Sequence, residues 1–113
     1  MIDPYAEFAQ APQDLGQTEA PPVAKDPMQY VASKLHKDYG WSPEASAGIV
    51  GNLYHESKMK GDIWGDSGAS FGLAQWNGPR RKSLADYATK AGKAADDLDT
   101  QIEFLSYELM TSH

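Results

Sequence analysis

The chain has 113 residues, with 10 Lys and Arg against 16 Asp and Glu, and its formal charge is −6 at pH 7. This length allows one small domain, and the absence of cysteine excludes a disulfide scaffold or a thiolate-bound metal. The sequence has no apolar run of about 18 residues, so it predicts no membrane span, and its first residues do not resemble a secretory signal. The acidic balance argues against broad electrostatic binding of nucleic acid.

Residues 1–25 differ in composition from the remainder of the chain. They are rich in Pro, Gln, Ala and acidic side chains and show no sustained apolar period. Such a segment cannot bury enough apolar surface to offset the entropy lost on ordering. We therefore expect a flexible acidic arm over residues 1–25 and a folded domain over residues 26–113.

Start and stop signals predict two helices at the beginning of this domain. Asp26-Pro27 supplies a capping side chain and a proline at the first helical position, and Gly40 fits the C-terminal stop. Ser42-Pro43 then repeats the start signal. The second helix is expected to follow directly from it.

A glycine-rich insert separates these two helices from two more. Residues 60–78 contain five glycines, which exclude a long helix and predict a short β-hairpin or an ordered loop. Pro79 opens a third helix that Gly92 ends, and the apolar spacing over residues 98–109 predicts a fourth. The sequence thus predicts a mainly α domain with a short β insert.

One carboxylate interrupts the apolar stripe of the second helix. The stripe runs through Ala45, Ile49 and Leu53, and Glu56 falls about 20° from Ile49 around a helix of 3.6 residues per turn. A carboxyl group on a half-buried apolar face loses hydration, and desolvation favours its protonated form. A protonated carboxyl group can act as a general acid. The pattern therefore predicts a half-buried, catalytic Glu56; the alternative is a frayed helix with Glu56 in solvent.

The insert after Glu56 combines aromatic rings with hydrogen-bonding side chains. Trp64, Phe71 and Trp76 offer flat apolar faces. Hydrogen-bonding groups come from four further residues: Asp66, Ser70, Gln75 and Asn77. Sugars present apolar C–H faces ringed by hydroxyl groups, so this mixture is typical of a glycan-binding groove. The alternative is that the tryptophans are ordinary core residues.

An ordered set of motifs gives the chain a family resemblance. Glu56-Ser57, Trp64-Gly65-Asp66 and Phe71-Gly72-Leu73-Ala74-Gln75 resemble the goose-type lysozyme and soluble lytic transglycosylase branch of the lysozyme superfamily. Residues 47–53, 72–76 and 97–105 are similar to phage tail-associated lysozyme domains. The resemblance covers residues 28–110 and implies a lysozyme-like helical domain.

The resemblance also implies an activity, which is hydrolysis of the β-1,4 bond between N-acetylmuramic acid and N-acetylglucosamine in bacterial peptidoglycan. It implies that Glu56 is the catalytic acid and that Asp66 helps to hold the attacking water. Asn77 stands where goose-type relatives have a further aspartate, and an amide cannot accept a proton as a base. Substrate contacts are expected from six residues of the insert: Trp64, Ser70, Phe71, Gln75, Trp76 and Asn77.

No cofactor or metal ion is expected. His55-Glu56-Ser57-Lys58-Met59 resembles the start of a zincin helix, but Met59 stands where the second histidine ligand is required. The basic run Arg80-Arg81-Lys82 is expected to be a solvated first turn of a helix. Its functional alternative is contact with the lactyl or peptide carboxylates of cell-wall material.

Three alternatives to a muramidase stay open. Glu56 acting alone would give the anhydro product of a lytic transglycosylase, a fold without turnover would be a glycan-binding virion module, and a third possibility is cleavage of the peptide cross-link. The expected location is the virion, as a tail or internal ejected protein, with residues 1–25 contacting other virion proteins. Family members usually continue past the last predicted helix, so the domain is expected to be truncated at its C-terminal end or to be part of a longer polypeptide.

Overall fold

The computed structural model describes residues 26–111. The arm expected over residues 1–25 lies outside the described residues. The described part contains four α-helices and a three-stranded antiparallel sheet. The elements in chain order are α2 (Pro27–Tyr39), α3 (Pro43–Ser57), β1 (Trp64–Gly65), β2 (Ser70–Phe71), β3 (Trp76–Asn77), α4 (Gly78–Ala91) and α5 (Leu98–Thr111). The predicted mainly α, lysozyme-like fold with a short β insert is confirmed.

The chain divides into two compact units between Asn52 and Leu53, inside α3. In the first unit, α2 begins as predicted, because Asp26 Oδ1 accepts a hydrogen bond of 3.0 Å from the Gln29 N–H. The helix ends at Gly40, whose left-handed conformation (φ 80°) directs its N–H to the Leu35 carbonyl. Both predicted boundaries of this helix are therefore confirmed.

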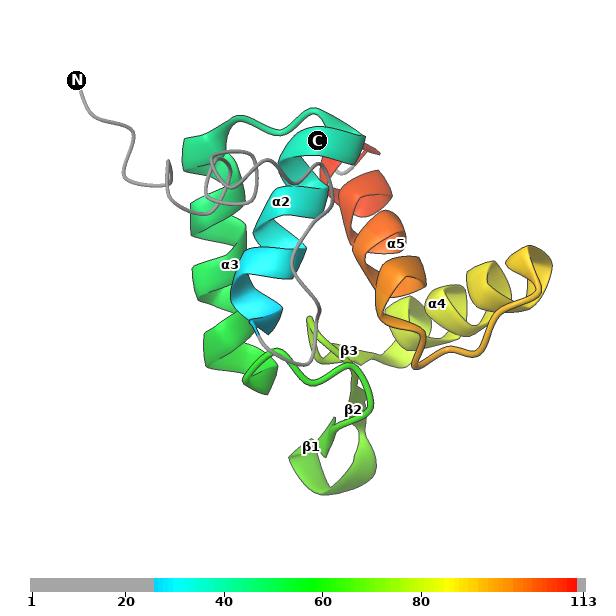
Figure 1. The fold of residues 1–113 in the computed structure, drawn as a ribbon. Coiled ribbons are helices and arrows are strands. Elements are labelled where there is room, and N and C mark those ends of the chain that lie inside the picture. Colours follow the sequence, from blue (N-terminus) through cyan, green and yellow to red (C-terminus); the bar gives the residue numbers. More distant parts are fainter. Residues whose placement is uncertain (1–25, 112–113) are drawn as a thin grey trace. The chain divides into compact units, whose positions relative to one another are not determined.

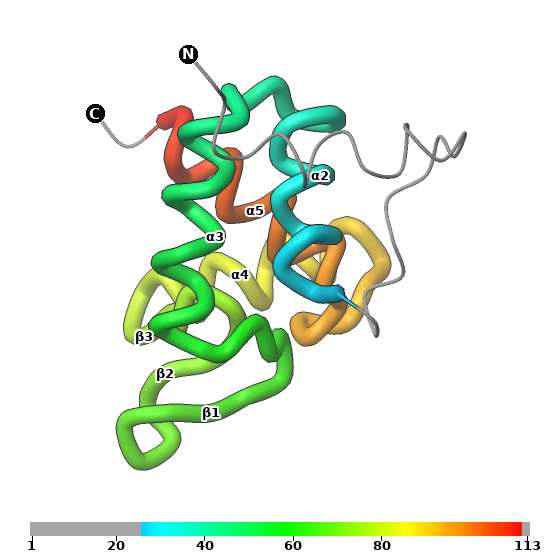
Figure 2. The backbone as a smooth tube through the Cα atoms, turned by 60° about the vertical axis from the view of Figure 1, so that its left-hand side comes forward, coloured from blue at the N-terminus to red at the C-terminus, as the bar shows by residue number. Residues whose placement is uncertain are grey.

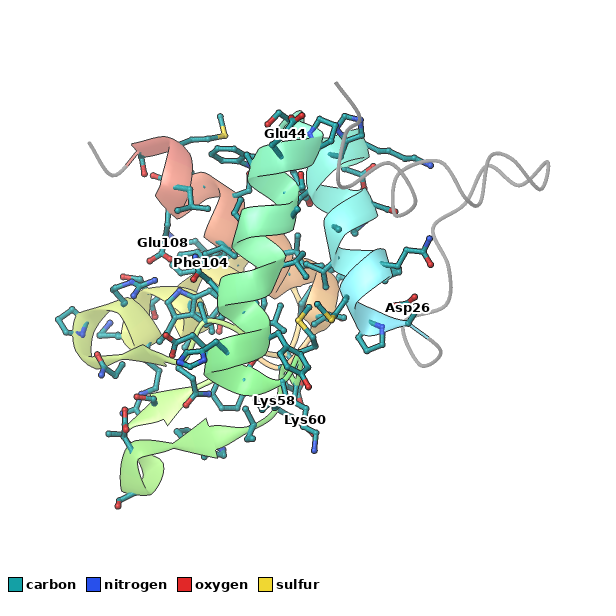
Figure 3. The ribbon with its side chains drawn as sticks, turned by 90° about the vertical axis from the view of Figure 1, so that its left-hand side faces the viewer. Asp26, Glu44, Lys58, Lys60, Phe104 and Glu108 are labelled. Carbon is teal, nitrogen blue, oxygen red and sulfur yellow. The ribbon has the colours of Figure 1, made fainter. Side chains whose placement is uncertain are left out.

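Helix α3 starts and stops by different means. At its start, the Ser42 hydroxyl accepts a hydrogen bond of 3.0 Å from the Ala45 N–H, as the Ser-Pro signal predicts. At its end no glycine is present, and Lys58 and Met59 turn the chain with positive φ values of 54° and 67°. Figure 3 labels Lys58 and Lys60 where the chain leaves α3. Met59 is buried, and this burial offsets the cost of the left-handed backbone.

The glycine-rich insert of the second unit forms a small sheet with the order β1-β2-β3. Trp64 pairs with Phe71, which in turn pairs with Trp76, and the next register pairs Ser70 with both Gly65 and Asn77. Figure 1 shows β3 leading directly into α4. Because successive side chains of a strand point to opposite faces, the aromatic residues share one face and Ser70 and Asn77 share the other.

The core of the second unit lies between the sheet, α4 and α5. Helix α4 packs against β2, β3 and α5, and the tube in Figure 2 follows this path from the sheet into α4 and on to α5. The fully buried Trp76 lies 5.7 Å from Phe104, measured between ring centroids, and Phe104 lies 5.4 Å from Tyr87. Within residues 26–111, none of the helices has the length and apolar character needed to span a membrane.

Candidate active site

Backbone strain is concentrated in the segment between α3 and β3. Every described residue other than glycine with positive φ lies there. Left-handed backbone costs an ordinary residue on the order of 1–3 kcal/mol, and such residues cluster at functional sites. The five residues are Lys58, Met59, Asp66, Ser67 and Gln75. The strained segment includes Asp66 and begins two residues after Glu56, so the backbone independently marks the region that the motifs indicate.

Two glutamine side chains hold this segment in place. Gln75 Nε2 donates to the carbonyls of Gly72, at 2.9 Å, and Ile63, at 3.3 Å. The fully buried Gln101 of α5 accepts a hydrogen bond of 3.0 Å from the Leu73 N–H. It also donates to two carbonyls, those of Gly61 at 2.8 Å and Ala95 at 2.7 Å. The predicted substrate-binding residue Gln75 is thus engaged with the backbone of the insert.

Close packing explains two of the glycines in the insert. A Cβ at Gly65 would collide with Oε1 of Gln75, and a Cβ at Gly72 would lie 2.9 Å from Nε2 of Gln101. Gly72 also has a φ of 87°, which L side chains rarely adopt. The glycines therefore let both amide side chains approach the backbone.

Three of the predicted site residues form one hydrogen-bonded chain. The Ser70 hydroxyl donates to Asp66 Oδ2 at 2.7 Å, and Asn77 Nδ2 donates to the same hydroxyl at 3.5 Å. Asn77 Nδ2 can only donate, so the single hydroxyl proton of Ser70 must be directed at Asp66. Ser70 is buried and Asp66 is exposed. The arrangement fixes one oxygen of Asp66 and leaves the carboxylate accessible from solvent.

Glu56 departs from its predicted environment. Its side chain is exposed, and the expectation that it lies on a half-buried apolar stripe is wrong. The buried positions of α3 near it are Ser46, Val50, Leu53 and Ser57. Glu56 lies about 90° around the helix from the centre of that face. Two serines occupy the buried face, and this shifts it away from the stripe of Ala45 and Ile49 that hydropathy alone indicates.

Helix α3 nevertheless holds Glu56 in a regular position. Ser57, the next residue, is buried, and its hydroxyl donates a hydrogen bond of 3.0 Å to the Leu53 carbonyl. The Lys58 N–H continues the helical pattern to the Tyr54 carbonyl at 2.9 Å. Of the alternative of a frayed helix with Glu56 in solvent, the fraying is not observed, whereas the exposure of Glu56 is. Glu56 is a solvent-exposed carboxyl group on an ordered last turn.

The predicted aromatic residues are divided between a cavity and the core. Trp64, 56% exposed, and the buried Phe71 have ring centroids 4.6 Å apart and line a cavity of about 320 Å³ next to α4. Trp76 is fully buried, which is the alternative stated for the tryptophans. The structure therefore places Trp64 and Phe71 together, on the face of the sheet opposite Ser70 and Asn77.

A further carboxylate, which the sequence analysis did not single out, accepts a hydrogen bond from Trp76. Glu108 of α5 accepts a hydrogen bond of 2.8 Å from the Trp76 indole N–H. It also accepts two from the Arg80 guanidinium, at 2.9 Å from Nε and 2.8 Å from Nη2. Figure 3 labels Glu108 on α5, one turn beyond Phe104. The bidentate pair with Arg80 connects the start of α4 to α5, and the Trp76 hydrogen bond connects β3 to the same carboxylate.

The environment of Glu108 shifts its titration. Burial raises the pKa of the Glu108 carboxyl, but the hydrogen bonds from Arg80 and Trp76 and the charge of Arg80 outweigh burial and lower it below its usual range. The same hydrogen bond raises the pKa of Arg80. Glu108 is therefore held ionised, with its acceptor positions filled by neighbouring donors. Such a group stabilises the fold and has little capacity left for substrate.

Among the described residues, no group of three or more His, Asp or Glu side chains is arranged to hold a metal ion. Glu56 and Asp66 are exposed, and Glu108 accepts hydrogen bonds from Trp76 and Arg80.

Comparison with known proteins gives a family match that covers all of the described residues. The family model described as phage tail lysozyme matches residues 26–113. Morphogenesis protein 1 of Bacillus phage B103 is 33% identical to this chain over an alignment of 86 residues. The alignment covers 72% of this chain and 23% of that protein. The chain thus spans less than a quarter of the length of this curated relative. No solved structure matches.

Proposed function

The chain belongs to the phage tail lysozyme family, and from this premise we propose that it is a virion-associated muramidase. In this proposal it hydrolyses the β-1,4 bond between N-acetylmuramic acid and N-acetylglucosamine. Membership of the family supports a phage-associated, lysozyme-like protein. Action on peptidoglycan, the bond cleaved and the roles of individual residues are the proposal.

The observation that carries the proposal is the pair of accessible carboxylates, Glu56 and Asp66, in the second unit. Both are exposed, both belong to the family motifs, and the strained segment that begins at Lys58 connects them. Glycoside hydrolysis needs two carboxyl groups with different tasks, one to protonate the leaving oxygen and one to direct water or stabilise charge. Glu56 and Asp66 are the two exposed carboxylates that the motifs indicate for these tasks.

Glu56 is the proposed general acid. Its exposure in the free protein means that the bound glycan has to remove water from it. A glycan strand that covers the last turn of α3 desolvates the carboxyl group and favours its protonated form. The proton is then available to the glycosidic oxygen as the bond breaks.

Asp66 is the proposed holder of the attacking water. One of its oxygens is fixed by the Ser70 hydroxyl at 2.7 Å, and the carboxylate is open to solvent. Asn77 supports this arrangement through Ser70 and supplies no proton acceptor of its own. Ser70 and Asn77 are therefore positioning residues, and Asp66 alone accepts the proton of the water.

The test is muropeptide release from purified sacculi by the wild-type chain and by Glu56→Gln. General acid catalysis contributes about a hundredfold to ten-thousandfold, so Glu56→Gln is expected to release muropeptides at least about a hundredfold more slowly. The control is Glu103→Gln, which removes an exposed glutamate of α5 and is expected to leave the rate unchanged. Equal rates for wild type and Glu56→Gln would contradict the assignment.

A further inference from the structure

The cavity beside the sheet has an apolar floor and an aromatic wall. It has a volume of about 320 Å³, at the small end of the range of about 300–1,000 Å³ for small-ligand sites. It lies on the aromatic face of the sheet, where Trp64 exposes half of its surface. The lining residues are Trp64, Phe71, Gly78, Arg81, Lys82, Leu84, Ala85 and Ala95.

The charges at this cavity are of one sign. Arg81 and Lys82 line it, and no acidic side chain of the described chain does. The Arg81 guanidinium lies 5.4 Å from the centroid of the Trp64 ring and donates to the Gly68 carbonyl at 3.1 Å. These two contacts hold the guanidinium beside the aromatic wall while its other N–H groups remain available. Arg80, the first residue of the basic run, is instead paired with Glu108.

Lys82 is also available to a ligand. Its ion pair with Asp86 spans 3.0 Å, but both side chains are largely exposed. Exposed pairs of this kind contribute little, so an incoming carboxylate can compete for the ammonium group. Gly78, the first residue of α4, lines the same cavity, and the positive end of the helix dipole adds to the two cations.

We propose that this cavity binds the lactyl-linked stem peptide of peptidoglycan, with Arg81 and Lys82 receiving its carboxylates. The inference rests on the proposed function, because it assigns the substituent of the same substrate. A stem peptide combines small methyl groups with carboxylates. The methyl groups match Ala85, Ala95 and the aromatic wall, and the carboxylates match the two cations.

The position of the cavity is compatible with a glycan held at Asp66. The sheet order makes β1 an edge strand, so a ligand can pass around it from the Ser70 face to the Trp64 face. A peptide of four residues extends about 13 Å, which is more than twice the spacing of about 4.8 Å between neighbouring strands. A stem peptide is therefore long enough to pass around β1, an edge strand of two residues.

The test uses N-acetylmuramoyl-L-alanyl-D-glutamic acid, a single sugar without a glycosidic bond to cleave. Its binding is followed by backbone amide chemical shifts of the full chain. We expect saturable shifts at Gly78, Ala85 and Ala95, and at least about a fivefold weaker affinity in Arg81→Gln, because charge-assisted hydrogen bonds are the stronger polar contacts. Lys90→Gln removes an exposed cation of the same helix and is the matched control.

Each outcome of this titration decides one question. Absence of shifts at the cavity, or equal affinities for wild type and Arg81→Gln, would overturn the peptide subsite even if sacculi are cleaved. Binding as tight for tri-L-glutamate would overturn it in favour of a protein partner. Saturable binding that Arg81→Gln weakens supports the subsite, and it does so even if the cleavage assay contradicts the muramidase assignment.

Discussion

Asp66 and Glu108, two carboxylates of the second unit, are held in opposite ways. Asp66 is exposed on a strained turn, and one oxygen accepts a hydrogen bond from Ser70. Glu108 is half-buried and accepts three hydrogen bonds, from Trp76 and Arg80. A carboxylate whose acceptor positions are filled connects elements of the fold, whereas one that remains open to solvent is free to act on a substrate. The difference supports the proposed role of Asp66 in the chemistry and assigns Glu108 to the fold.

The largest effect in this comparison is expected on activity, from Asp66→Asn. The amide oxygen can still accept the Ser70 hydrogen bond, so folding is preserved while the negative charge is lost. Muropeptide release should fall on the order of a hundredfold, with the melting temperature unchanged. Asp62→Asn, an exposed aspartate in the same segment, is the control and should behave as wild type. A fully active Asp66→Asn would remove Asp66 from the mechanism.

The next effect is on stability, from Glu108→Gln. This change replaces a bidentate ion pair with a neutral amide, although the Arg80 side chain is 55% exposed and solvent screens part of the loss. We expect a loss of about 1–2 kcal/mol in the free energy of unfolding, seen as a melting temperature lower by about 5–10 °C. Glu103→Gln on the same helix should change the free energy by less than about 0.5 kcal/mol. A melting temperature equal to that of wild type would show that the pair contributes nothing.

The smallest expected effect is on how steeply the free energy of unfolding falls at acidic pH. The pKa of Glu108 is lower in the folded state than in the unfolded chain, where it is about 4.3. Its contribution is therefore complete above the unfolded pKa and is lost as the pH falls towards the folded pKa. Thermal unfolding between pH 6 and pH 3 should show a shallower loss of stability for Glu108→Gln. The variant still loses stability at acidic pH, because hydrogen bonds from Thr100 also lower the pKa of Asp97. Parallel curves for the two proteins would contradict this account.

Helix boundaries could be predicted because their signals are local. Asp26 caps α2 by accepting from a residue within one turn, and the Ser42 hydroxyl likewise accepts from a residue three positions ahead. Gly40 and Gly92 end their helices with left-handed backbone. The glycine density over residues 60–78 likewise excluded a long helix. Each of these signals depends on residues that are neighbours in the sequence.

Which face of α3 is buried could not be predicted from hydropathy. A buried serine satisfies its hydroxyl inside the helix, as Ser57 does with the Leu53 carbonyl, so Ser46 and Ser57 occupy positions that a hydropathy pattern assigns to solvent. The resulting rotation exposes Glu56. The motif around Glu56 does not depend on burial, so the proposed role of Glu56 rests on the motif alone.

Hydrogen bonds between residues far apart in the sequence could not be predicted either. Glu108 bonds to Trp76 across 32 positions, and Gln101 reaches Leu73 across 28. Leu109 belongs to the apolar spacing that predicted α5, yet it is exposed, and its neighbour Glu108 accepts a hydrogen bond from the Trp76 indole. The sequence offered one sign that Gln101 is buried, which is its position beside Ile102 within the apolar spacing over residues 98–109.

The nature of the ends that the wild-type chain leaves on purified sacculi tests the central claim most directly. The products are reduced with borohydride and identified by mass spectrometry. The account predicts disaccharide peptides that end in reduced N-acetylmuramic acid and carry uncleaved stem peptides. Products with 1,6-anhydro ends would show a transglycosylase, cut stems on intact glycan would show a peptidase, and either result would contradict the muramidase.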